Sequence, residues 1–600
     1  MTENKVPYRN EIPVEYTWNA SSVFPSLSDW ELEVEKIPGD LQRLRAFQGT
    51  LKNIPSTLVD VLQCRDAIFN RVQKVDMFAY ISYQVDKTDQ TAASMIGKAK
   101  TLVGQALAAG SFIEPEILEI GWQIIQEWIQ TEPELQIYAH YFDNLFRKQT
   151  HIRSAEVEEL LGLLADPFAG AEITAGTLTD GDFKFHPAVG SDGQQVEVTQ
   201  GSLNKIYANP DRMLRHSAWE SYTNQFLAFN NTLANNLATS IKQFVFKSNA
   251  RHHISSLEAA LFENSIPVSV FHNMIDTFRR NLPTWHRYFA VRRRILGIEA
   301  LQPFDMWAPL TTQKHEFSFS QAIEMICQGL EPMGKDYVRV IRKGCLEDRW
   351  VDIYPNQGKN AGAFSFGSPG THPFIVMNYN GEIFSLSTLA HELGHSMHSY
   401  LTWQTQPFVY TDYPLFVAEV ASNFHQAMVR AYLLDNYPDR DFQISVIEEA
   451  MANFYRYFLL MPTLARFELE THQRVERGDG LNAEAMNALM ADLFEEAYGD
   501  YVTVDRPRVG ITWATFGHLF VDYYVFQYAT GIAGANALAR RILSGVPGAV
   551  EDYLSFLKSG ASVYPIDALK MAGVDLTSTK PVDDAFQILA SYVDRLEDLA

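Results

Sequence analysis

The chain has 600 residues, in which 72 aspartates and glutamates outnumber 49 lysines and arginines, so the formal charge is −23. Binding of nucleic acid rests on cationic side chains that release counterions from phosphates, and this charge therefore excludes nucleic acid as an expected partner. Hydrophobic residues make up 46% of the chain, which is enough for a large buried core and excludes a disordered protein.

The three cysteines, Cys64, Cys327 and Cys345, are scattered along the chain without a C-x-x-C spacing. This excludes a disulfide framework or a thiolate zinc cluster as the main organiser and fits a reducing compartment. The N-terminus lacks the basic and apolar stretches of a signal peptide, and no run of about 18 apolar residues predicts a membrane span. We therefore expect a cytoplasmic protein with no membrane partner.

Apolar residues recur at helical spacing over most of the chain, which predicts a mainly α fold. Segments 154–168, 255–266 and 551–560 show this pattern, with charged residues between the apolar ones. Ser154 is placed to cap the first of these predicted helices, and Gly560 is placed to end the last.

Two segments break the helical pattern. Residues 171–203, which are rich in Gly, Thr and Asp, predict a turn and a hairpin, and residues 348–382 predict short strands separated by glycines. We place a domain boundary in the first of these segments. It divides an N-terminal helical region (1–195) from a catalytic domain (196–600).

The most informative segment is SLSTLAHELGHSMHSYL, residues 385–401. His391 and His395 lie one turn apart on a predicted helix, so their imidazoles can converge on one metal ion. Glu392 lies beside the first histidine without being a ligand, which suits a general base that acts on a water molecule. The alternative is an exposed helix with incidental histidines. The number of such motifs expected by chance in a chain of this size is on the order of a few hundredths, which argues against this alternative.

A catalytic zinc site needs a third protein ligand, and Glu419 is the best candidate. It lies in PLFVAEVAS, an apolar setting in which a carboxylate needs a partner, on a second helix that begins near Leu415. An ordinary salt bridge of Glu419 is the alternative. His398 lies about 10 Å along the helix axis from His391, too far for both to bind one ion.

These segments resemble the oligoendopeptidase F branch of the thimet-oligopeptidase-type zinc peptidases. The resemblance rests on HELGHSMHS and FVAEVAS, with 24 positions from His395 to Glu419, and covers about residues 200–600. Further similar segments are GKNAGAFSFG (358–367), HPFIVMNYNGE (372–382), FGHLFVDYYVFQYATG (516–531) and YLSFLKSGASVYPIDALKMAGVDL (553–576).

The resemblance implies a mainly α, large helical clamshell with a deep central channel and a small β-sheet next to the zinc helix. It implies one Zn²⁺ per chain, held by His391, His395 and Glu419, with Glu392 as the base. Within the sheet, the strand PFIVMNY either supports the zinc helix or binds an extended peptide along an unpaired edge.

His518, Tyr523, Tyr524 and Tyr528 lie in residues 516–531, which we interpret as one helical stretch. Aromatic residues at helical spacing usually belong to a core. The resemblance implies instead that His518 and at least one tyrosine stabilise the oxyanion of the reaction. Which tyrosine does so stays open, because Tyr523 and Tyr524 are adjacent.

The chain departs from the family pattern in one place. Relatives tend to read Glu-Val-Ala-Ser-Thr-x-Asn-Glu, whereas Glu419 is followed here by Val-Ala-Ser-Asn-Phe-His-Gln, with Gln426 in place of the second glutamate. The ligand set is unaffected, so we expect an active enzyme in which metal affinity or the pH optimum differs.

We therefore expect a zinc-dependent oligoendopeptidase that hydrolyses internal bonds of short unstructured peptides. One alternative is a carboxypeptidase or dipeptidyl carboxypeptidase with the same chemistry, which needs a basic residue for the C-terminal carboxylate of the substrate. Another is a non-catalytic helical peptide-binding protein. The sequence does not decide between a monomer and a homo-oligomer.

Overall fold

The computed structural model describes residues 6–600, which form two compact units. Each unit combines three separate segments of the chain. Of the described residues, the first contains 6–150, His315–Leu433 and Leu538–Gly573, and the second contains His151–Lys314, Leu434–Ala537 and Val574–Ala600. The boundary predicted between residues 195 and 196 lies within the second unit and stays a prediction of how the sequence divides.

The first unit is mainly helical, with one small sheet. Its helices are α1 (Leu27–Arg45), α2 (Pro55–Val85), α3 (Gln90–Gly110), α4 (Ile113–Ile120), α5 (Trp122–Thr131), α6 (Ala139–Lys148), α15 (Phe319–Gly329), α16 (Lys335–Leu346), α17 (Ile383–Thr405), most of α18 (Leu415–Asn436), α24 (Ala549–Ser559) and α25 (Pro565–Met571). Its strands are β3 (Val351–Asp352), β4 (Phe364–Phe366) and β5 (Phe374–Val376).

The second unit is also mainly helical. Its helices are α7 (Ala155–Leu163), α8 (Ala165–Gly176), α9 (Leu203–Tyr207), α10 (Arg212–Ala228), α11 (Asn230–Ala250), α12 (Ser256–Phe262), α13 (Val268–Arg280), α14 (Leu282–Leu296), α19 (Arg440–Tyr455), α20 (Met461–Glu476), α21 (Ala483–Tyr498), α22 (Arg506–Gly510), most of α23 (Phe526–Leu543) and α26 (Lys580–Leu599). Its strands are β1 (Ala188–Val189) and β2 (Gln195–Val196). The predicted mainly α fold is confirmed.

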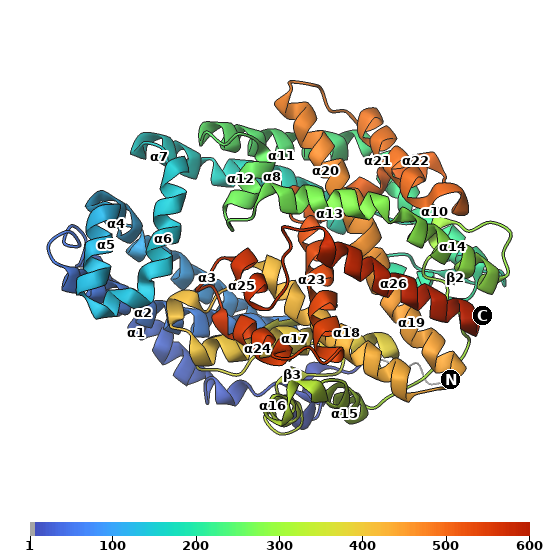
Figure 1. Ribbon diagram of the computed structural model, residues 1–600, viewed down its shortest axis with the longest axis horizontal. Helices are drawn as coiled ribbons and strands as arrows, with labels where there is room; N and C mark the ends of the chain where they lie inside the picture. Colours follow the sequence, from blue (N-terminus) through green and yellow to red (C-terminus); the bar gives the residue numbers. More distant parts are fainter. Residues whose placement is uncertain (1–5) are drawn as a thin grey trace. The chain divides into compact units, whose positions relative to one another are not determined.

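In the first unit, α1, α2 and α3 pack side by side (Figure 1). Their buried faces form one apolar cluster that also includes Phe374 and Val376 of β5. The sheet is therefore fixed to the N-terminal helices by its apolar side chains, although more than 200 residues separate them in the sequence.

The strands predicted within residues 348–382 are confirmed. They form a sheet in the order β3-β5-β4, in which β5 is parallel to β3 and antiparallel to β4. The strand PFIVMNY supplies β5, the central strand, so the prediction that it offers an unpaired edge is wrong. Within residues 6–600, the edge strand on the side of α17 is β4, against which α17 packs.

Two local predictions are corrected and one is confirmed. Residues 154–168 form two helices, because α7 ends at Leu163 and α8 begins at Ala165. Residues 171–176 continue α8 where a turn was predicted, since this helix packs on α11, and the predicted hairpin follows only at β1 and β2. Gly560 ends α24 with a φ of 52°, as predicted.

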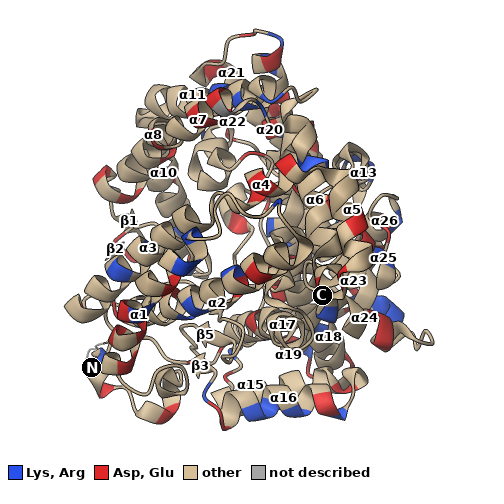
Figure 2. Ribbon diagram, turned by 90° about the vertical axis from the view of Figure 1, so that its left-hand side faces the viewer, with Lys and Arg blue, Asp and Glu red and all other residues tan. Residues whose placement is uncertain are grey.

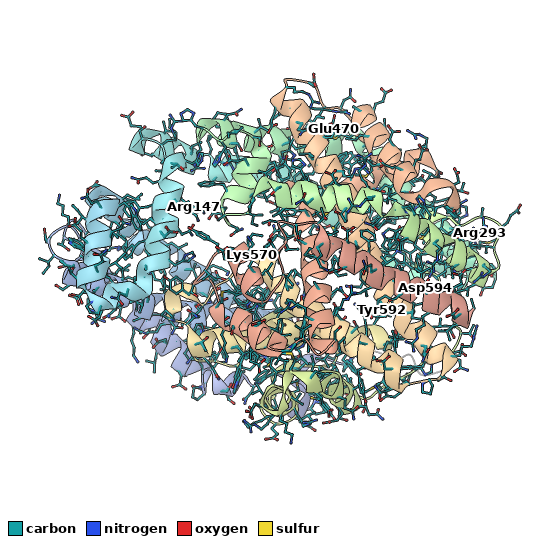
Figure 3. The ribbon with its side chains drawn as sticks, in the orientation of Figure 1. Arg147, Arg293, Glu470, Lys570, Tyr592 and Asp594 are labelled. Carbon is teal, nitrogen blue, oxygen red and sulfur yellow. The ribbon has the colours of Figure 1, made fainter. Side chains whose placement is uncertain are left out.

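Charged side chains lie on outer helices of both units. Figure 2 shows mainly Lys and Arg on α16 of the first unit, where Arg342 Nη2 lies 2.8 Å from Glu324 Oε2 of α15. In the second unit, exposed Arg293 extends from the last turn of α14, where a positive charge suits the helix dipole (Figure 3). No helix in the described part of the chain combines the length and the apolar character that a membrane span requires.

Candidate metal centre and active site

The first unit brings together the three residues predicted to bind a metal. His391 and His395 lie one turn apart on α17, and Glu419 lies on α18. One ligand atom from each residue lies within 4.8 Å of the others, and His391 Nε2 is 3.7 Å from Glu419 Oε2. The two imidazole planes are 84° apart, so they converge on one point from different directions.

Gly394 allows α17 and α18 to approach closely enough for this arrangement. A Cβ atom at this position would lie 2.6 Å from Ser422 Cα and still closer to the carbonyl oxygen of Ala421. Only glycine therefore lets the two helix backbones touch. Gly394 was not among the residues predicted to matter, although a glycine inside a predicted helix is unfavourable and so can indicate a close approach.

Side chains around the ligands fix their orientation. Gln426 Oε1 lies 3.1 Å from His391 Nδ1, and Gln426 Nε2 donates to Ser387 Oγ at 2.8 Å. Because the amide oxygen only accepts, Nδ1 of His391 carries a proton and Nε2 is left as the ligand atom. On α18, Ser422 Oγ and Asn423 Nδ2 lie 3.1 Å and 3.4 Å from Glu419 Oε2.

Glu392 is buried beside the ligand group. Burial raises the pKa of its carboxyl to about 7, the nearby charge of Glu419 acts in the same direction, and His391 and the backbone of Ser365 oppose the shift. A carboxylate with a pKa near neutrality can both accept and return a proton, as a general base must do. The contribution of Ser365, a residue of β4, was not foreseen from the sequence.

These side chains line a pocket of about 370 Å³ in the first unit. Glu392 and the three ligand residues form one part of its wall. Residues 363–367, which include β4, and Tyr413 form others. The edge strand therefore runs along the same pocket as the candidate ligands.

His398 lies outside the ligand group, as its distance along the helix predicts. Its side chain is buried and stacks on Tyr413, with ring centroids 3.7 Å apart. Burial lowers the pKa of His398 to about 3, so the ring is neutral. His398 thus packs under the pocket as part of the core.

The donor atoms fit a zinc ion. Two imidazole nitrogens and one carboxylate are a common set for catalytic zinc, in which a fourth position stays open for water or substrate. The fit is supported by the crossed planes of His391 and His395 and by the orientation that Gln426 gives to His391. A metal ion in this pocket would lie beside Glu392.

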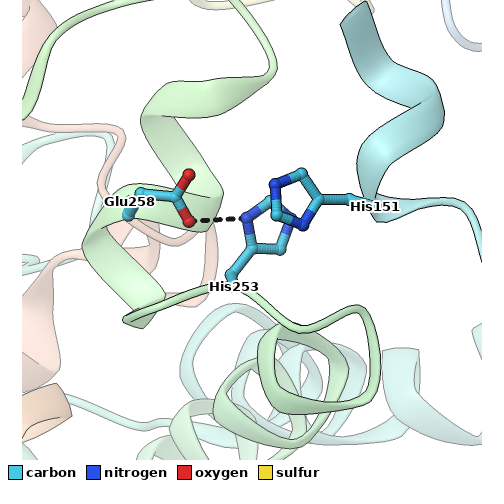
Figure 4. A group of neighbouring side chains, drawn as sticks. All are labelled: His151, His253 and Glu258. Carbon is cyan, nitrogen blue, oxygen red and sulfur yellow. Dashed lines mark hydrogen bonds and ion pairs between the residues drawn. The ribbon is translucent and has the colours of Figure 1, made fainter.

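A second group, His151, His253 and Glu258, also has ligand atoms within 4.8 Å of one another (Figure 4). Its two imidazoles are stacked, with centroids 3.7 Å apart and planes 12° apart. Nitrogen binds a metal in the plane of its ring at about 2 Å, so two nearly parallel rings do not share an ion without turning. Instead His253 Nδ1 bonds Glu258 Oε2 at 2.6 Å, and His151 Nδ1 donates to the carbonyl oxygen of Arg251 at 2.9 Å.

Residues 516–531 do not form the single helical stretch that their spacing predicts. Gly517–Phe520 is a 3-10 turn (η13), an irregular turn follows, and α23 begins only at Phe526. The backbone turns at Tyr523, whose φ of 53° lies in the left-handed region. Non-glycine residues rarely adopt this conformation, and nothing in the sequence marks Tyr523 for it.

His518, Tyr524 and Tyr528 nevertheless form one ring cluster in the second unit. The ring centroids lie 5.6 to 6.0 Å apart, and all three side chains are half-buried. Burial, together with the charge of Arg456, lowers the pKa of His518, so its ring is neutral at pH 7 and carries one N–H donor. Tyr523 is not part of this cluster. Its ring is 2% exposed and its hydroxyl lies 3.2 Å from Ser256 Oγ.

The chain is similar in sequence and fold to known proteins. The profile of peptidase family M3 matches residues 206–588, and that of oligopeptidase F matches residues 116–185. The chain is 32% identical to oligopeptidase PepF of Bacillus subtilis, over 99% of this chain and 89% of the relative, and 32% identical to the group B oligopeptidase PepB of Streptococcus agalactiae, over 98% of both.

Two crystal structures extend the similarity to three dimensions. One from Chlamydophila abortus is 28% identical, with a TM-score of 0.89 over 99% of this chain and 100% of the other. Oligoendopeptidase-F from Enterococcus faecium is 28% identical, with a TM-score of 0.74 over 95% of this chain and 99% of the other. The family profile and the full-length relatives agree with the ligand group on α17 and α18: this chain belongs to peptidase family M3.

Proposed function

We propose that the chain is a zinc-dependent oligoendopeptidase that hydrolyses internal peptide bonds of short unstructured peptides. The observation that carries the proposal is the convergence of His391, His395 and Glu419 in one pocket, with buried Glu392 beside them. Membership of peptidase family M3 and the oligoendopeptidase F relatives support the same activity.

Glu392 and Gln426 act together with the metal in the proposed reaction. Bound zinc would supply a Lewis acid that polarises the scissile carbonyl and makes a water molecule more acidic. Glu392 accepts the proton of the attacking water and passes it to the leaving amine. Gln426 holds His391 in the tautomer that leaves Nε2 free.

The substrate backbone is held by β4 in this proposal. Within residues 6–600, β4 pairs with β5 on one side only, and residues 363–367 line the pocket. An extended peptide can add to such an edge through main-chain hydrogen bonds, which do not depend on its sequence. This mode of binding suits an enzyme that accepts many unstructured peptides.

We assign stabilisation of the oxyanion to His518, Tyr524 and Tyr528. Their support is the ring cluster, which combines one neutral imidazole with two phenolic hydroxyl groups, and the resemblance to the oligoendopeptidase F family. Tyr523 is left out of this role, because its hydroxyl is engaged with Ser256 in the core. The carbonyl oxygen becomes charged only in the transition state, so these donors act on kcat more than on KM.

A cytoplasmic location is proposed on the basis of the cysteines. Cys64, Cys327 and Cys345 are all free, and burial raises the pKa of Cys327 to about 11, which keeps its thiol protonated. Thiols of this kind are typical of reducing compartments.

The test combines metal analysis with the cleavage of a peptide that is capped at both ends and carries an internal fluorophore and quencher. We expect one zinc per chain in the wild type and in Glu392→Gln, with cleavage lost only in the variant. Cleavage that persists in Glu392→Gln would show that another group is the base. A capped peptide that stays intact while its free-acid form is shortened would instead indicate a carboxypeptidase.

A further inference from the structure

The turn between His518 and α23 is held by a polar network inside the second unit. Tyr523 is buried, whereas its neighbour Tyr524 belongs to the ring cluster. Its φ of 53° is unusual for a tyrosine, so surrounding contacts must stabilise this conformation. Such outliers often mark segments whose exact placement matters for function.

Glu468 makes the contact that this conformation requires. It lies on α20, is 2% exposed, and its Oε1 accepts a hydrogen bond of 2.5 Å from the backbone N–H of Tyr523. A buried N–H needs a partner, and no strand or helix supplies one at a turn of this kind. Within residues 6–600, Glu468 Oε2 has no hydrogen-bond partner, so the bond to Tyr523 is the only hydrogen bond of this carboxyl.

Two further contacts hold the residues on either side of this bond. His472, one turn after Glu468 on α20, places Nε2 3.0 Å from Asp522 Oδ1, while its Nδ1 donates to the carbonyl oxygen of Glu468. Ser256 Oγ donates to Glu476 Oε1 at 2.6 Å, so the hydroxyl of Tyr523 donates to Ser256 at 3.2 Å. Two side chains of α20, together with Ser256 of α12, thus hold residues 522 and 523.

The same turn determines where two of the proposed oxyanion donors lie. The backbone N–H of Val521 donates to the carbonyl oxygen of His518 at 3.0 Å, and that of Tyr524 donates to Val521 at 3.2 Å. His518 and Tyr524 are therefore linked through one short hydrogen-bonded path, and a change in the backbone at Tyr523 moves them relative to each other.

We propose that Glu468 is a positioning residue of the peptidase reaction, which fixes the left-handed turn at Tyr523 and so places His518 and Tyr524 to stabilise the oxyanion. The inference rests on the proposed role of these two residues. Glu468 does not touch the substrate, and Tyr523 serves as an anchor in the core, which explains why adjacent tyrosines have different tasks.

The first test replaces Glu468 in the full-length zinc-loaded enzyme, with the capped quenched peptide as substrate. Glu468→Leu keeps the volume but removes the acceptor, and we expect kcat to fall about 10- to 100-fold with KM nearly unchanged, because a displaced donor acts on the transition state. Glu468→Gln keeps a carbonyl oxygen at the same position and should retain kcat within about threefold. Equal kcat in Glu468→Leu and the wild type would overturn the inference.

A matched control separates positioning from general stability. Glu448 of α19 is a half-buried glutamate of the second unit, and its Oε1 likewise accepts from a backbone N–H, that of Leu310 at 2.7 Å. Glu448→Leu should lower the melting temperature without lowering kcat. If Glu468→Leu does not fold, Glu468→Asp withdraws the acceptor while keeping a carboxyl, and the same loss of kcat is expected. If kcat falls together with the melting temperature in both Glu468→Leu and Glu448→Leu, Glu468 is not a positioning residue.

A double-mutant cycle tests whether Glu468 acts through the ring cluster. If it does, adding Glu468→Leu to His518→Ala should lower kcat by a smaller factor than Glu468→Leu lowers it in the wild type, because only the placement of Tyr524 is left to lose. If the kcat losses of the two single variants multiply in the double variant, the inference is refuted, while the role of His518 is unaffected. An unchanged kcat in His518→Ala would refute the proposed oxyanion role and the inference with it. Tyr523→Phe, which keeps the ring in the core, should retain kcat within about threefold, whereas a loss like that of His518→Ala would make Tyr523 itself a donor.

Discussion

Gln426 determines which nitrogen of His391 faces the ligand group. Its Oε1 accepts from Nδ1 and its Nε2 is held by Ser387, so the amide cannot turn without losing a hydrogen bond. A neutral amide orients the imidazole but makes it a weaker donor than a carboxylate would. We therefore expect Gln426 to affect metal affinity through His391, while the candidate ligands themselves are unchanged.

Substitution of Gln426 should therefore change zinc affinity in two directions. Gln426→Leu should weaken zinc binding about 10- to 100-fold, and Gln426→Glu should strengthen it, as measured by competition with a fluorescent chelator at fixed pH. Gln443→Leu is the matched control, since Gln443 is a buried glutamine outside the pocket that donates to the backbone carbonyl groups of Leu434 and Tyr437 and accepts from Arg595 Nε at 3.3 Å. Equal zinc affinity in all three variants would contradict the role of Gln426.

Glu392 should set the acid limb of the pH profile. It must be ionised to accept a proton, and burial raises its pKa to about 7 in the metal-free chain. A bound cation favours the ionised form and lowers this value, so kcat/KM should fall as the pH decreases through a point below 7. The measurement is kcat/KM against pH, with zinc content determined at each point. A flat profile at constant zinc content between about pH 5 and pH 8 would argue against Glu392 as the base.

At this scale, the sequence predicts what local spacing encodes. His391 and His395 are one helical turn apart, and Glu419 is a charged residue among apolar ones. The three candidate ligands could therefore be predicted from the sequence alone. The partner of Gln426 and the backbone contact of Ser365 with Glu392 could not be predicted. Both depend on how α18 and β4 pack against α17, which no local pattern describes.

At the scale of elements, the metal centre depends on the contact between α17 and α18. The two backbones meet at Gly394, between the two histidines, and this contact sets the distance from His391 to Glu419. A pair of helices in contact through glycine leaves no room for adjustment by side-chain rotation. The glycine is therefore as important to the ligand geometry as the ligands themselves.

Gly394→Ala should separate the helices and weaken the metal site. We expect a loss of about 1–3 kcal/mol in the free energy of unfolding from overpacking, together with weaker zinc binding. Gly104→Ala in α3 is the control, because a Cβ atom there meets nothing within 4 Å, and it should be neutral or stabilising. The checks are the melting temperature and chelator competition on both variants. Unchanged zinc affinity in Gly394→Ala would show that α17 and α18 can move apart without moving the ligands.

The elements also show why sequence patterns can mislead. In residues 516–531, aromatic residues at helical spacing resemble a helix, yet the positive φ of Tyr523 interrupts it. The backbone N–H of Tyr523 bonds to Glu468, which lies more than 50 residues earlier. In the sheet, the alternation of PFIVMNY predicts a strand but contains no information on its neighbours, so β5 could not be identified as central.

At the scale of the whole molecule, the chain returns twice to each compact unit. Local periodicity predicts the helices well, since each helix needs only its own apolar face. It does not predict which helices share a core, and the division at 195/196 follows composition alone. The core of the first unit joins apolar residues of the N-terminal helices to Phe374 and Val376 of the sheet, which lie more than 200 positions later in the chain.

A buried ion network makes one of these long-range connections. Asp352 of β3 is 1% exposed and is contacted by Arg9 at 2.6 Å and by Lys359 of the glycine-rich loop at 2.7 Å. Burial alone would raise the pKa of Asp352, but the hydrogen bond from Arg9 and the charge of Lys359 outweigh it, so the pKa is lowered. The network joins the N-terminal segment and the glycine-rich loop, residues 358–367, to the sheet that carries the pocket.

Removal of Arg9 should destabilise the protein in a pH-dependent way. Because the pKa of Asp352 is lower in the folded chain than in the unfolded chain, the network stabilises the fold above about pH 4, and this stabilisation is lost as the pH falls through the folded value. Arg9→Met should therefore lose about 1–3 kcal/mol near neutral pH, and its difference from the wild type should shrink below about pH 4. Unfolding curves of both proteins across this range provide the measurement. Arg339→Met, which removes an exposed partner of Asp336, should have little effect at any pH. A difference between Arg9→Met and the wild type that stays constant down to the lowest pH would mean that Arg9 acts through packing and not through the charge of Asp352.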